Sequence, residues 1–213
     1  MTVTVKICGI TDVDALEAAV TGGAEMVGFV FYPPSPRAVR PEIVADFVDI
    51  LPDETEVVGL FVDADDSTLD TVLSHVRLDL IQCHGAETPE RVEAIRLEYG
   101  LPVMKAISIE TALDFDTVQA YLDVADRLLF DTKPPKGAAL PGGNAISFDW
   151  ALLSGRKFPL PWMLAGGLDA GNVAEAIRIS GAKAVDVSSG VELAPGKKDP
   201  AKIQAFIKAA KGG

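Results

Sequence analysis

The sequence predicts a closed barrel of eight parallel strands, each followed by a helix, in one domain over residues 1–213. Eight short apolar runs alternate with eight longer segments of helical periodicity, which is the element count of a (β/α)8, or TIM, barrel. The runs are bounded by glycine, proline or polar residues, as is typical of parallel strands buried on both faces. No linker or low-complexity segment interrupts the alternation. An open doubly wound sheet fits the same alternation but usually has fewer strands.

In chain order, the expected strands are residues 3–8, 26–31, 57–62, 78–83, 103–107, 127–131, 162–165 and 184–188. The expected helices are residues 12–22, 41–51, 66–76, 89–99, 111–124, 147–155, 171–180 and 200–211. Two helix starts are clear, because Thr88-Pro89 and Asp199-Pro200 each place a capping side chain before a first-turn proline. Glycines at Gly22-Gly23, Gly100 and Gly181 mark helix ends.

Composition restricts the class of protein. Of the 213 residues, 48% are hydrophobic, which is too many for a disordered chain, and the net charge is −12. This acidic excess argues against nucleic-acid or anionic-membrane partners, since both need a basic face. The longest apolar run, residues 26–32, is too short to span a bilayer, and the N-terminus does not resemble a signal peptide.

The metal-binding residue types are scarce. Two cysteines cannot build a disulfide framework, so we expect a reducing, cytoplasmic location. Two histidines cannot form a three-histidine metal site, and the chain has no C-x-x-C pair. We therefore expect no metal.

A barrel of this kind carries its chemistry at the carboxyl ends of the strands and on the loops that follow. Polar residues and glycines gather at these positions. They are Cys8-Gly9, the 31–37 loop, Asp63, His84-Gly85, Asp131, Gly166-Gly167 and Ser188-Ser189-Gly190. We expect the functional site there.

Cys8 ends the first strand. Strand residues alternate between faces, so Lys6 and Cys8 should face the barrel interior while Val5 and Ile7 face the helices. Cys8 is then either a small buried hydrophobe or a catalytic thiol. By the same alternation Cys83 should point into the helix layer, where we expect a structural role.

Asp131 ends the sixth strand, alternating with Leu129 on the inward face. Partial burial at a barrel mouth suits a carboxylate to general acid catalysis, although it could equally cap a helix or brace a loop. Asp63 and Asp186 are weaker candidates for the same role.

Two glycine turns end the seventh and eighth strands, in residues 165–168 (AGGL) and 188–192 (SSGVE). Barrels often bind phosphate at these two loops, where backbone N–H groups and a short helix N-terminus meet the anion. Each turn alone could be purely structural. Together they predict a phosphate site that includes Gly166, Gly167, Ser189 and Gly190.

Two further loops are candidates for substrate contact. Arg37 follows three prolines in residues 32–37, and its guanidinium could hold a substrate carboxylate or be merely solvated. Residues 134–145 (PPKGAALPGGNA) form the longest turn-rich stretch, which is either a mobile lid or a passive loop.

Seven short stretches, in one order along nearly the whole chain, resemble phosphoribosylanthranilate isomerase of tryptophan biosynthesis. They are residues 6–11 (KICGIT), 28–37 (GFVFYPPSPR), 58–63 (VGLFVD), 82–85 (QCHG), 130–132 (FDT), 164–168 (LAGGL) and 186–192 (DVSSGVE). KICG followed by the SPR loop is the most diagnostic pair.

The resemblance implies a barrel enzyme that uses no metal or organic cofactor. The family converts N-(5-phosphoribosyl)anthranilate to 1-(2-carboxyphenylamino)-1-deoxyribulose 5-phosphate, an Amadori rearrangement. Cys8 matches the general base, Asp131 the general acid and Arg37 the residue that binds the anthranilate carboxylate. An ordinary thiol is mostly protonated at neutral pH, so the site should favour the Cys8 thiolate, with the first helix N-terminus as one candidate source.

One departure stands out: the family usually has Gly-Gly-Thr-Gly after the sixth strand, where this chain has Gly-Gly-Asn-Ala at 142–145.

Other phosphate-binding barrels remain as alternatives. A metal-dependent epimerase should have several inward histidines, and indole-glycerol-phosphate synthase should have catalytic lysine and glutamate. A bifunctional isomerase would be expected to carry an aspartate in place of Cys8. A non-catalytic phosphate sensor would leave Cys8 and Asp131 without a role. Both monomer and homodimer are compatible with the sequence.

Overall fold

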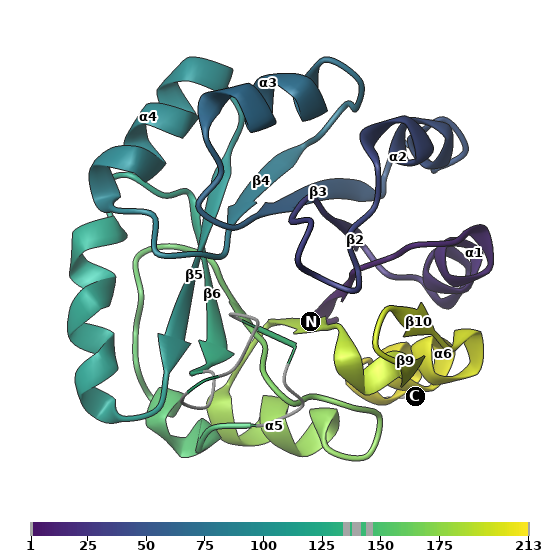
Figure 1. The fold of residues 1–213 in the computed structure, drawn as a ribbon. Helices are drawn as coiled ribbons and strands as arrows, with labels where there is room; N and C mark the ends of the chain where they lie inside the picture. The colour runs from purple at the N-terminus through teal and green to yellow at the C-terminus, as the bar shows by residue number, and fades with distance from the viewer. Residues whose placement is uncertain (1, 134–136, 138–141, 144–146, 213) are drawn as a thin grey trace.

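Eight parallel strands close into a barrel with helices around its outside (Figure 1). The structure is a computed structural model, and it describes residues 2–133, 137, 142–143 and 147–212. The strands are β1 (Thr4–Cys8), β2 (Met26–Val30), β3 (Glu56–Phe61), β4 (Leu80–Cys83), β5 (Val103–Ile109), β6 (Arg127–Thr132), β7 (Trp162–Leu164) and β8 (Ala184–Val187). Each strand pairs with the next, and Thr4 pairs with Ala184 to close the sheet. The predicted barrel is confirmed.

The α-helices are α1 (Val13–Gly22), α2 (Pro41–Val48), α3 (Asp66–Leu73), α4 (Pro89–Tyr99), α5 (Val173–Ser180) and α6 (Pro200–Ala210). Thr88 accepts a hydrogen bond from the Arg91 N–H, and Asp199 accepts from Ala201 and Lys202, which confirms both predicted helix starts. Gly23, Gly100 and Gly181 adopt the left-handed conformation that ends a helix.

The connections after β5 and β6 differ from the expected α-helices. They are the 3₁₀ helices η1 (Ala112–Tyr121) and η2 (Trp150–Leu153). In η1 the buried side chains Phe115 and Val118 are three residues apart, which matches the three-residue turn of a 3₁₀ helix. The Asp114 carboxylate also accepts hydrogen bonds from the backbone of Glu110 and Thr111, which tightens the first turn.

The core has two parts, as a barrel requires. The larger part fills the space between strands and helices and contains Val5, Ile7 and Cys83, as strand alternation predicts. A smaller apolar cluster fills one end of the barrel interior: Met26, Val58, Leu80, Met104, Leu129, Met163 and Ala165. Towards the carboxyl ends the interior becomes polar, with Lys6, Gln82, Asp131 and Asp186 all buried.

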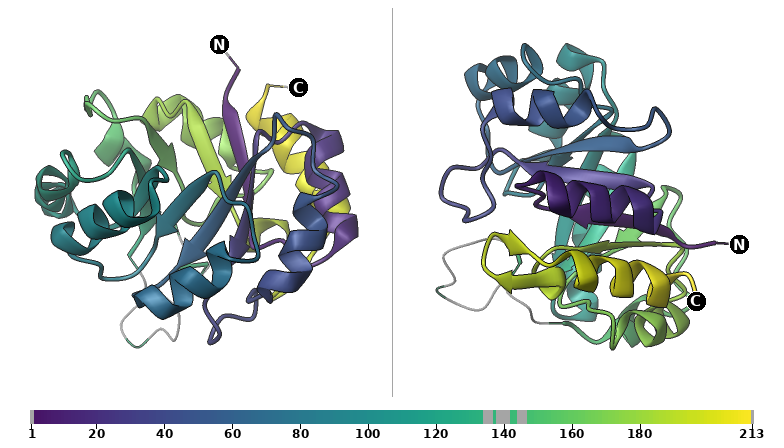
Figure 2. Two further views of the ribbon diagram at one scale, coloured as in Figure 1. Left: turned by 90° about the horizontal axis from the view of Figure 1, so that it is seen from above. Right: turned by 90° about the vertical axis from the view of Figure 1, so that its right-hand side faces the viewer.

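After β8 comes a short 3₁₀ turn, η3 (Ser189–Val191), and then a hairpin of β9 (Glu192–Ala194) and β10 (Lys197–Lys198) that the sequence did not predict. The hairpin lies beside α6 (Figure 2), and the chain termini lie together at one end of the barrel. Within the described residues, no helix combines the length and apolar character needed to cross a bilayer. Residues 134–145, expected to form either a mobile lid or a passive loop, fall mostly outside the described residues.

Candidate active site

A hollow of about 820 Å³ opens at the carboxyl ends of the strands. Its lining includes six of the predicted site residues: Cys8, Arg37, Asp131, Gly166, Gly167 and Ser189. The lining also includes His84 and Ser188, which the sequence analysis expected at the strand ends without a role, and Asp186, its weaker acid candidate. Thr132, to which it gave no role, lines the hollow as well. The hollow lies at the end of the barrel where the fold concentrates chemistry.

Cys8 faces this hollow from the end of β1, beside Gly28 on β2, and is 3% exposed. Burial raises the pKa of the Cys8 thiol, and the positive charges of Lys6 and Lys198 act against that effect. The net direction in the free protein is upward, which does not by itself support the expectation that the site favours the Cys8 thiolate.

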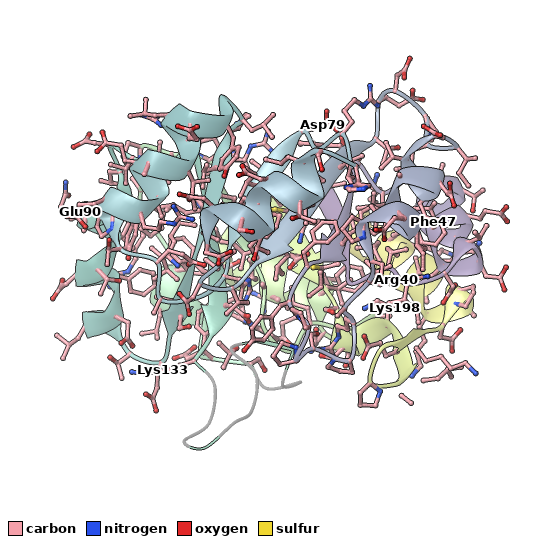
Figure 3. All side chains as sticks on the ribbon, turned by 45° about the horizontal axis from the view of Figure 1, so that its top comes forward. Arg40, Phe47, Asp79, Glu90, Lys133 and Lys198 are labelled. Carbon is pink, nitrogen blue, oxygen red and sulfur yellow. The ribbon has the colours of Figure 1, made fainter. Side chains whose placement is uncertain are left out.

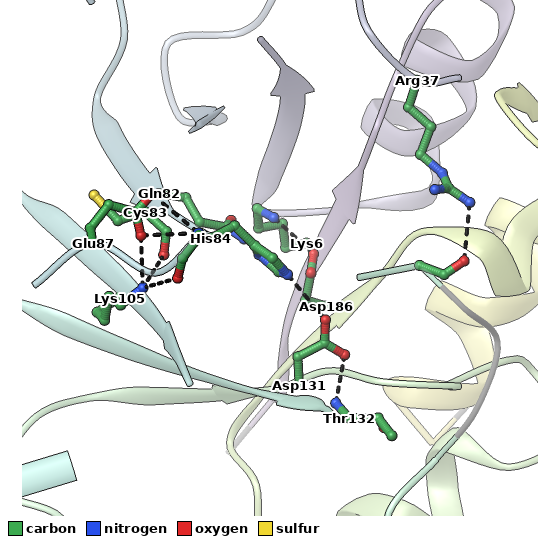
Figure 4. A network of polar contacts seen from close by, with 12 residues as sticks. Lys6, Arg37, Gln82, Cys83, His84, Glu87, Lys105, Asp131, Thr132 and Asp186 are labelled. Atoms are coloured by element: carbon green, nitrogen blue, oxygen red, sulfur yellow. Dashed lines mark hydrogen bonds and ion pairs between the residues drawn. The ribbon is translucent and has the colours of Figure 1, made fainter. Parts of the chain in front are cut away.

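Asp131 faces the hollow from β6 and is held on both carboxylate oxygens. Oδ1 accepts a hydrogen bond from the Thr132 N–H at 2.7 Å, and Oδ2 lies 3.1 Å from His84 Nε2. The other ring nitrogen, Nδ1, lies 2.8 Å from the amide nitrogen of Gln82 (Figure 4). These contacts fix the direction of the Asp131 carboxyl group and connect it to β4.

The sequence analysis placed His84 among the strand-end positions of the expected site without giving it a role, and it did not assign Gln82 to the site. The available signal was alternation along β4, which places Gln82 and His84 on the inward face. The sequence did not show that His84 meets Asp131, because the two residues are 47 positions apart.

Arg37 is 6% exposed and paired, so it is not the solvated arginine of the alternative interpretation. Its Nε and Nη2 donate to the two carboxylate oxygens of Glu192 at 2.8 and 3.0 Å, and Nη2 also donates to the Gly143 carbonyl. Glu192 accepts a further hydrogen bond from Lys198 Nζ at 2.9 Å. Burial raises the pKa of Glu192, but the Arg37 hydrogen bonds and the Lys198 charge outweigh it and lower that pKa overall.

The trio of Arg37, Glu192 and Lys198 thus combines two cations with one anion at the edge of the hollow. Figure 3 labels Lys198 on the hairpin near the 31–37 side of the molecule. The contact between Arg37 and Glu192 spans 155 positions, so no local pattern could have revealed it.

The two glycine loops meet at the hollow. Gly166 and Gly167 both have positive φ angles, of 86° and 62°, and a side chain on Gly166 would overlap Thr132. Ser188 and Ser189 line the hollow beside them. Gly190 is not part of the lining, because its Cα packs against the Leu168 carbonyl and a side chain there would overlap that oxygen.

The two weaker aspartate candidates serve other contacts. Asp63 adopts a positive φ of 49°, accepts a hydrogen bond from the Ala86 N–H and does not line the hollow. Asp186 does line it, and pairs with Lys6 at 2.9 Å. Within the residues that the structure describes, no group of three or more His, Cys, Asp or Glu side chains is arranged to hold a metal.

Comparison with known proteins identifies the family. Residues 5–209 match the family model of N-(5′-phosphoribosyl)anthranilate isomerase. The enzyme of that name from Paramagnetospirillum magneticum is 69% identical over 100% of this chain and 99% of its own length. The one from Rhodospirillum rubrum is 56% identical over 98% of both chains.

Solved structures agree with the sequence comparison. Phosphoribosyl anthranilate isomerase from Thermotoga maritima has a TM-score of 0.87 and 39% identity, covering 99% of this chain and 100% of its own. A second solved phosphoribosyl anthranilate isomerase is in complex with reduced 1-(o-carboxyphenylamino)-1-deoxyribulose 5-phosphate. It has a TM-score of 0.83 and 36% identity, covering 99% of this chain and 100% of its own. The chain therefore belongs to the N-(5′-phosphoribosyl)anthranilate isomerase family.

Proposed function

We propose that this protein converts N-(5-phosphoribosyl)anthranilate to 1-(2-carboxyphenylamino)-1-deoxyribulose 5-phosphate in tryptophan biosynthesis. The observation that carries the proposal is that Cys8 and Asp131 line one hollow from two different strands, with Arg37 and the glycine loops at its edge. The names of the relatives and the ligand of the solved complex support this assignment.

The first chemical step assigns Asp131 as general acid. Its carboxyl proton passes to the furanose ring oxygen while the C1′–O bond breaks and the anthranilate nitrogen forms a C1′=N bond. The contacts from Thr132 and His84 support this role because they hold the carboxyl group in one direction. The ring opens to a Schiff base, and Asp131 is left ionised.

The second step assigns Cys8 as general base. Its thiolate removes the proton on C2′, and the released electron pair moves to the nitrogen, giving an enolamine that tautomerises to the ketone. Asp131 loses one proton and Cys8 gains one, so the reaction is an isomerisation that needs no external oxidant or reductant. Each positioned proton transfer is typically worth about 10²–10⁴ in rate.

The two charged ends of the substrate fit different edges of the hollow. We assign the anthranilate carboxylate to Arg37, whose guanidinium Glu192 holds in place. We assign the phosphate to the backbone N–H groups near Gly166, Gly167 and Ser189, with Gly190 permitting the close approach of the two loops. This assignment explains how a protein of net charge −12 holds a substrate with two anionic groups.

Three further expectations belong to the proposal. The reaction as written uses no metal or cofactor. Both cysteines are unpaired, which supports a reducing, cytoplasmic compartment. The Thermotoga maritima enzyme is described as dimeric. For this chain we propose that the oligomeric state is either monomer or homodimer.

The test is turnover of phosphoribosylanthranilate, generated in situ and followed by the loss of its anthranilate fluorescence. We expect Cys8→Ala and Asp131→Asn each to lower kcat by about 10² or more. Cys83→Ala is the matched control, because Cys83 is equally buried but packs in the helix layer. Turnover that survives Cys8→Ala would remove Cys8 as the base, and a folded parent without turnover would overturn the proposed function.

A further inference from the structure

Lys6 is a buried cation that the reaction described above does not use. Its side chain is fully buried inside the barrel, and its Nζ lies 2.9 Å from Asp186 Oδ1. Burying a charge is costly even when it is paired, and an apolar side chain of similar volume often stabilises a protein more. A buried lysine at this position therefore calls for an explanation beyond packing.

The strand places Lys6 directly below the proposed base. Lys6 and Cys8 share the inward face of β1, and Cys8 pairs in register with Gly28 on β2. A Cβ atom on Gly28 would lie 3.0 Å from Cys8 Sγ and 3.2 Å from Lys6 Cε. Both side chains therefore lean over the same glycine, and the absence of a side chain at Gly28 leaves the space in which they meet.

A second buried lysine shows what a purely structural pair looks like in this barrel. Lys105 Nζ donates to Glu87 at 2.8 Å and to the carbonyls of Gly85 and Cys83 at 2.7 and 3.5 Å. Its three N–H groups thus have three oxygen acceptors. Across the described residues, Lys6 Nζ has one, Asp186. Figure 4 marks the contact between Lys6 and Asp186 with a dashed line.

The charges around Cys8 give Lys6 a specific effect. Burial is the largest influence and raises the pKa of the thiol; Lys6 is the largest influence that lowers it, ahead of the opposing charge of Asp186. The other titratable groups near Cys8 are Lys198 on β10 and, lining the same hollow, Arg37, His84 on the β4 side and Asp131 on β6.

We propose that Lys6 is a positioning residue for the isomerase, and that its ammonium group, anchored by Asp186, stabilises the thiolate form of Cys8. The inference rests on the proposed role of Cys8 as the base. Before proton loss the ammonium faces a neutral thiol, and afterwards it faces an anion at short range in a water-excluded site. The attraction therefore favours the reactive form selectively.

The test measures ionisation of Cys8 without substrate. The alkylation rate of Cys8 by iodoacetamide is followed against pH, with peptide mass spectrometry separating Cys8 from Cys83. The midpoint of the curve reports ionisation, whereas its plateau reports access to the thiol. The variants are Lys6→Met and Lys6→Met/Asp186→Asn; the double variant removes the ion pair as a unit and leaves no unpaired buried charge. The matched control is Lys105→Met/Glu87→Gln, which removes the other buried pair.

We expect the Cys8 midpoint to rise by about one pH unit or more in Lys6→Met and to stay at the parent value in the control. In the double variant we expect a smaller rise, because the charge of Asp186, which opposes ionisation of Cys8, is removed as well. Below the midpoint, one unit lowers the thiolate fraction about tenfold. Turnover near neutral pH should fall by the same factor, with kcat affected more than KM, and should recover as the pH is raised.

Two results would overturn the inference: an unchanged midpoint in the double Lys6 variant, or an equal rise in the Lys105 control. The proposed function is judged separately, by turnover of the parent. A parent that does not turn over phosphoribosylanthranilate would reject that function, while the alkylation curves would still decide whether Lys6 controls Cys8.

Discussion

His84 is the side chain that connects the proposed acid to the neighbouring strand. Its Nε2 lies 3.1 Å from Asp131 Oδ2, and its Nδ1 is held by Gln82. We expect His84→Gln to lower kcat about tenfold or more, because the carboxyl group would lose one of the two contacts that fix its direction. Steady-state turnover measures the effect. His75→Gln is the control, since His75 is exposed and its ring nitrogen hydrogen-bonds at its own helix end; equal losses in both variants would contradict this role.

Glu192 is the one anion between two buried cations, Arg37 and Lys198. Replacing it by glutamine leaves both cations without a counter-charge, and breaking a buried pair in this way typically costs about 3–5 kcal/mol. We expect Glu192→Gln to lower the free energy of unfolding by an amount in that range, as measured by urea denaturation, and to raise KM because Arg37 loses its support.

Glu175 provides the comparison for Glu192. Its pair with Arg178 lies on the surface of α5, where an ion pair contributes about 0–1 kcal/mol. If Glu175→Gln and Glu192→Gln cost the same, the buried trio has no special role in stability.

Among the elements, the hairpin of β9 and β10 carries Lys198 to the site, and it touches the proline loop that carries Arg37. The contact is made at Gly196, which has a φ of 80° and whose Cα faces the Pro36 carbonyl. We expect Gly196→Ala to displace the two loops from each other, raising KM several-fold and destabilising the protein. The control is Gly155→Ala, where φ is 71° but a Cβ would meet open space.

Both glycine variants carry the cost of a left-handed conformation, about 1–2 kcal/mol. The difference between them therefore isolates the contact with Pro36. Unfolding curves and KM measured side by side provide the comparison. Equal stability and equal KM in the two variants would show that the hairpin does not position the Arg37 loop.

The strands were predictable because burial on both faces leaves short apolar runs between turn residues, and strand alternation correctly assigned Cys8 inward and Cys83 outward. The 3₁₀ form of η1 was not predictable, because the three-residue spacing of Phe115 and Val118 also fits part of an α-helical pattern. Site positions at strand ends were predictable from the barrel. The partners of Arg37 and Asp131 were not, because closure of the barrel brings together residues that are far apart in sequence.

At the scale of the whole molecule, acid should weaken the fold through carboxylates that are more acidic when folded. Burial works against this at Glu192, but Arg37 and Lys198 lower its pKa below the ordinary 4.5; hydrogen bonds from Thr111 lower that of Asp114 below 3.8. The unfolded chain then binds more protons, so stability is present above these ordinary values and is lost as the pH falls through them. Urea denaturation at stepped pH should show this decline, with a shallower slope in Glu192→Gln. A free energy of unfolding that is flat through this range would contradict the assignment.

Alkali should also weaken the fold, through the two buried thiols. Their pKa values are higher in the folded protein than in the unfolded chain, so the free energy of unfolding decreases as the pH rises. Burial raises the pKa of Cys8 above the ordinary 9.0 and that of Cys83 from 9.0 to about 12. Above pH 9 the unfolded chain has lost protons that the folded chain keeps. The free energy of unfolding should therefore fall with rising pH, by up to about 1.4 kcal/mol per unit for each thiol.

Cys83→Ala removes one thiol without touching the hollow, so urea denaturation between pH 8 and 10 should give a shallower decline in this variant than in the parent. Parallel declines would mean that the Cys83 thiol ionises as readily in the folded barrel as in the unfolded chain.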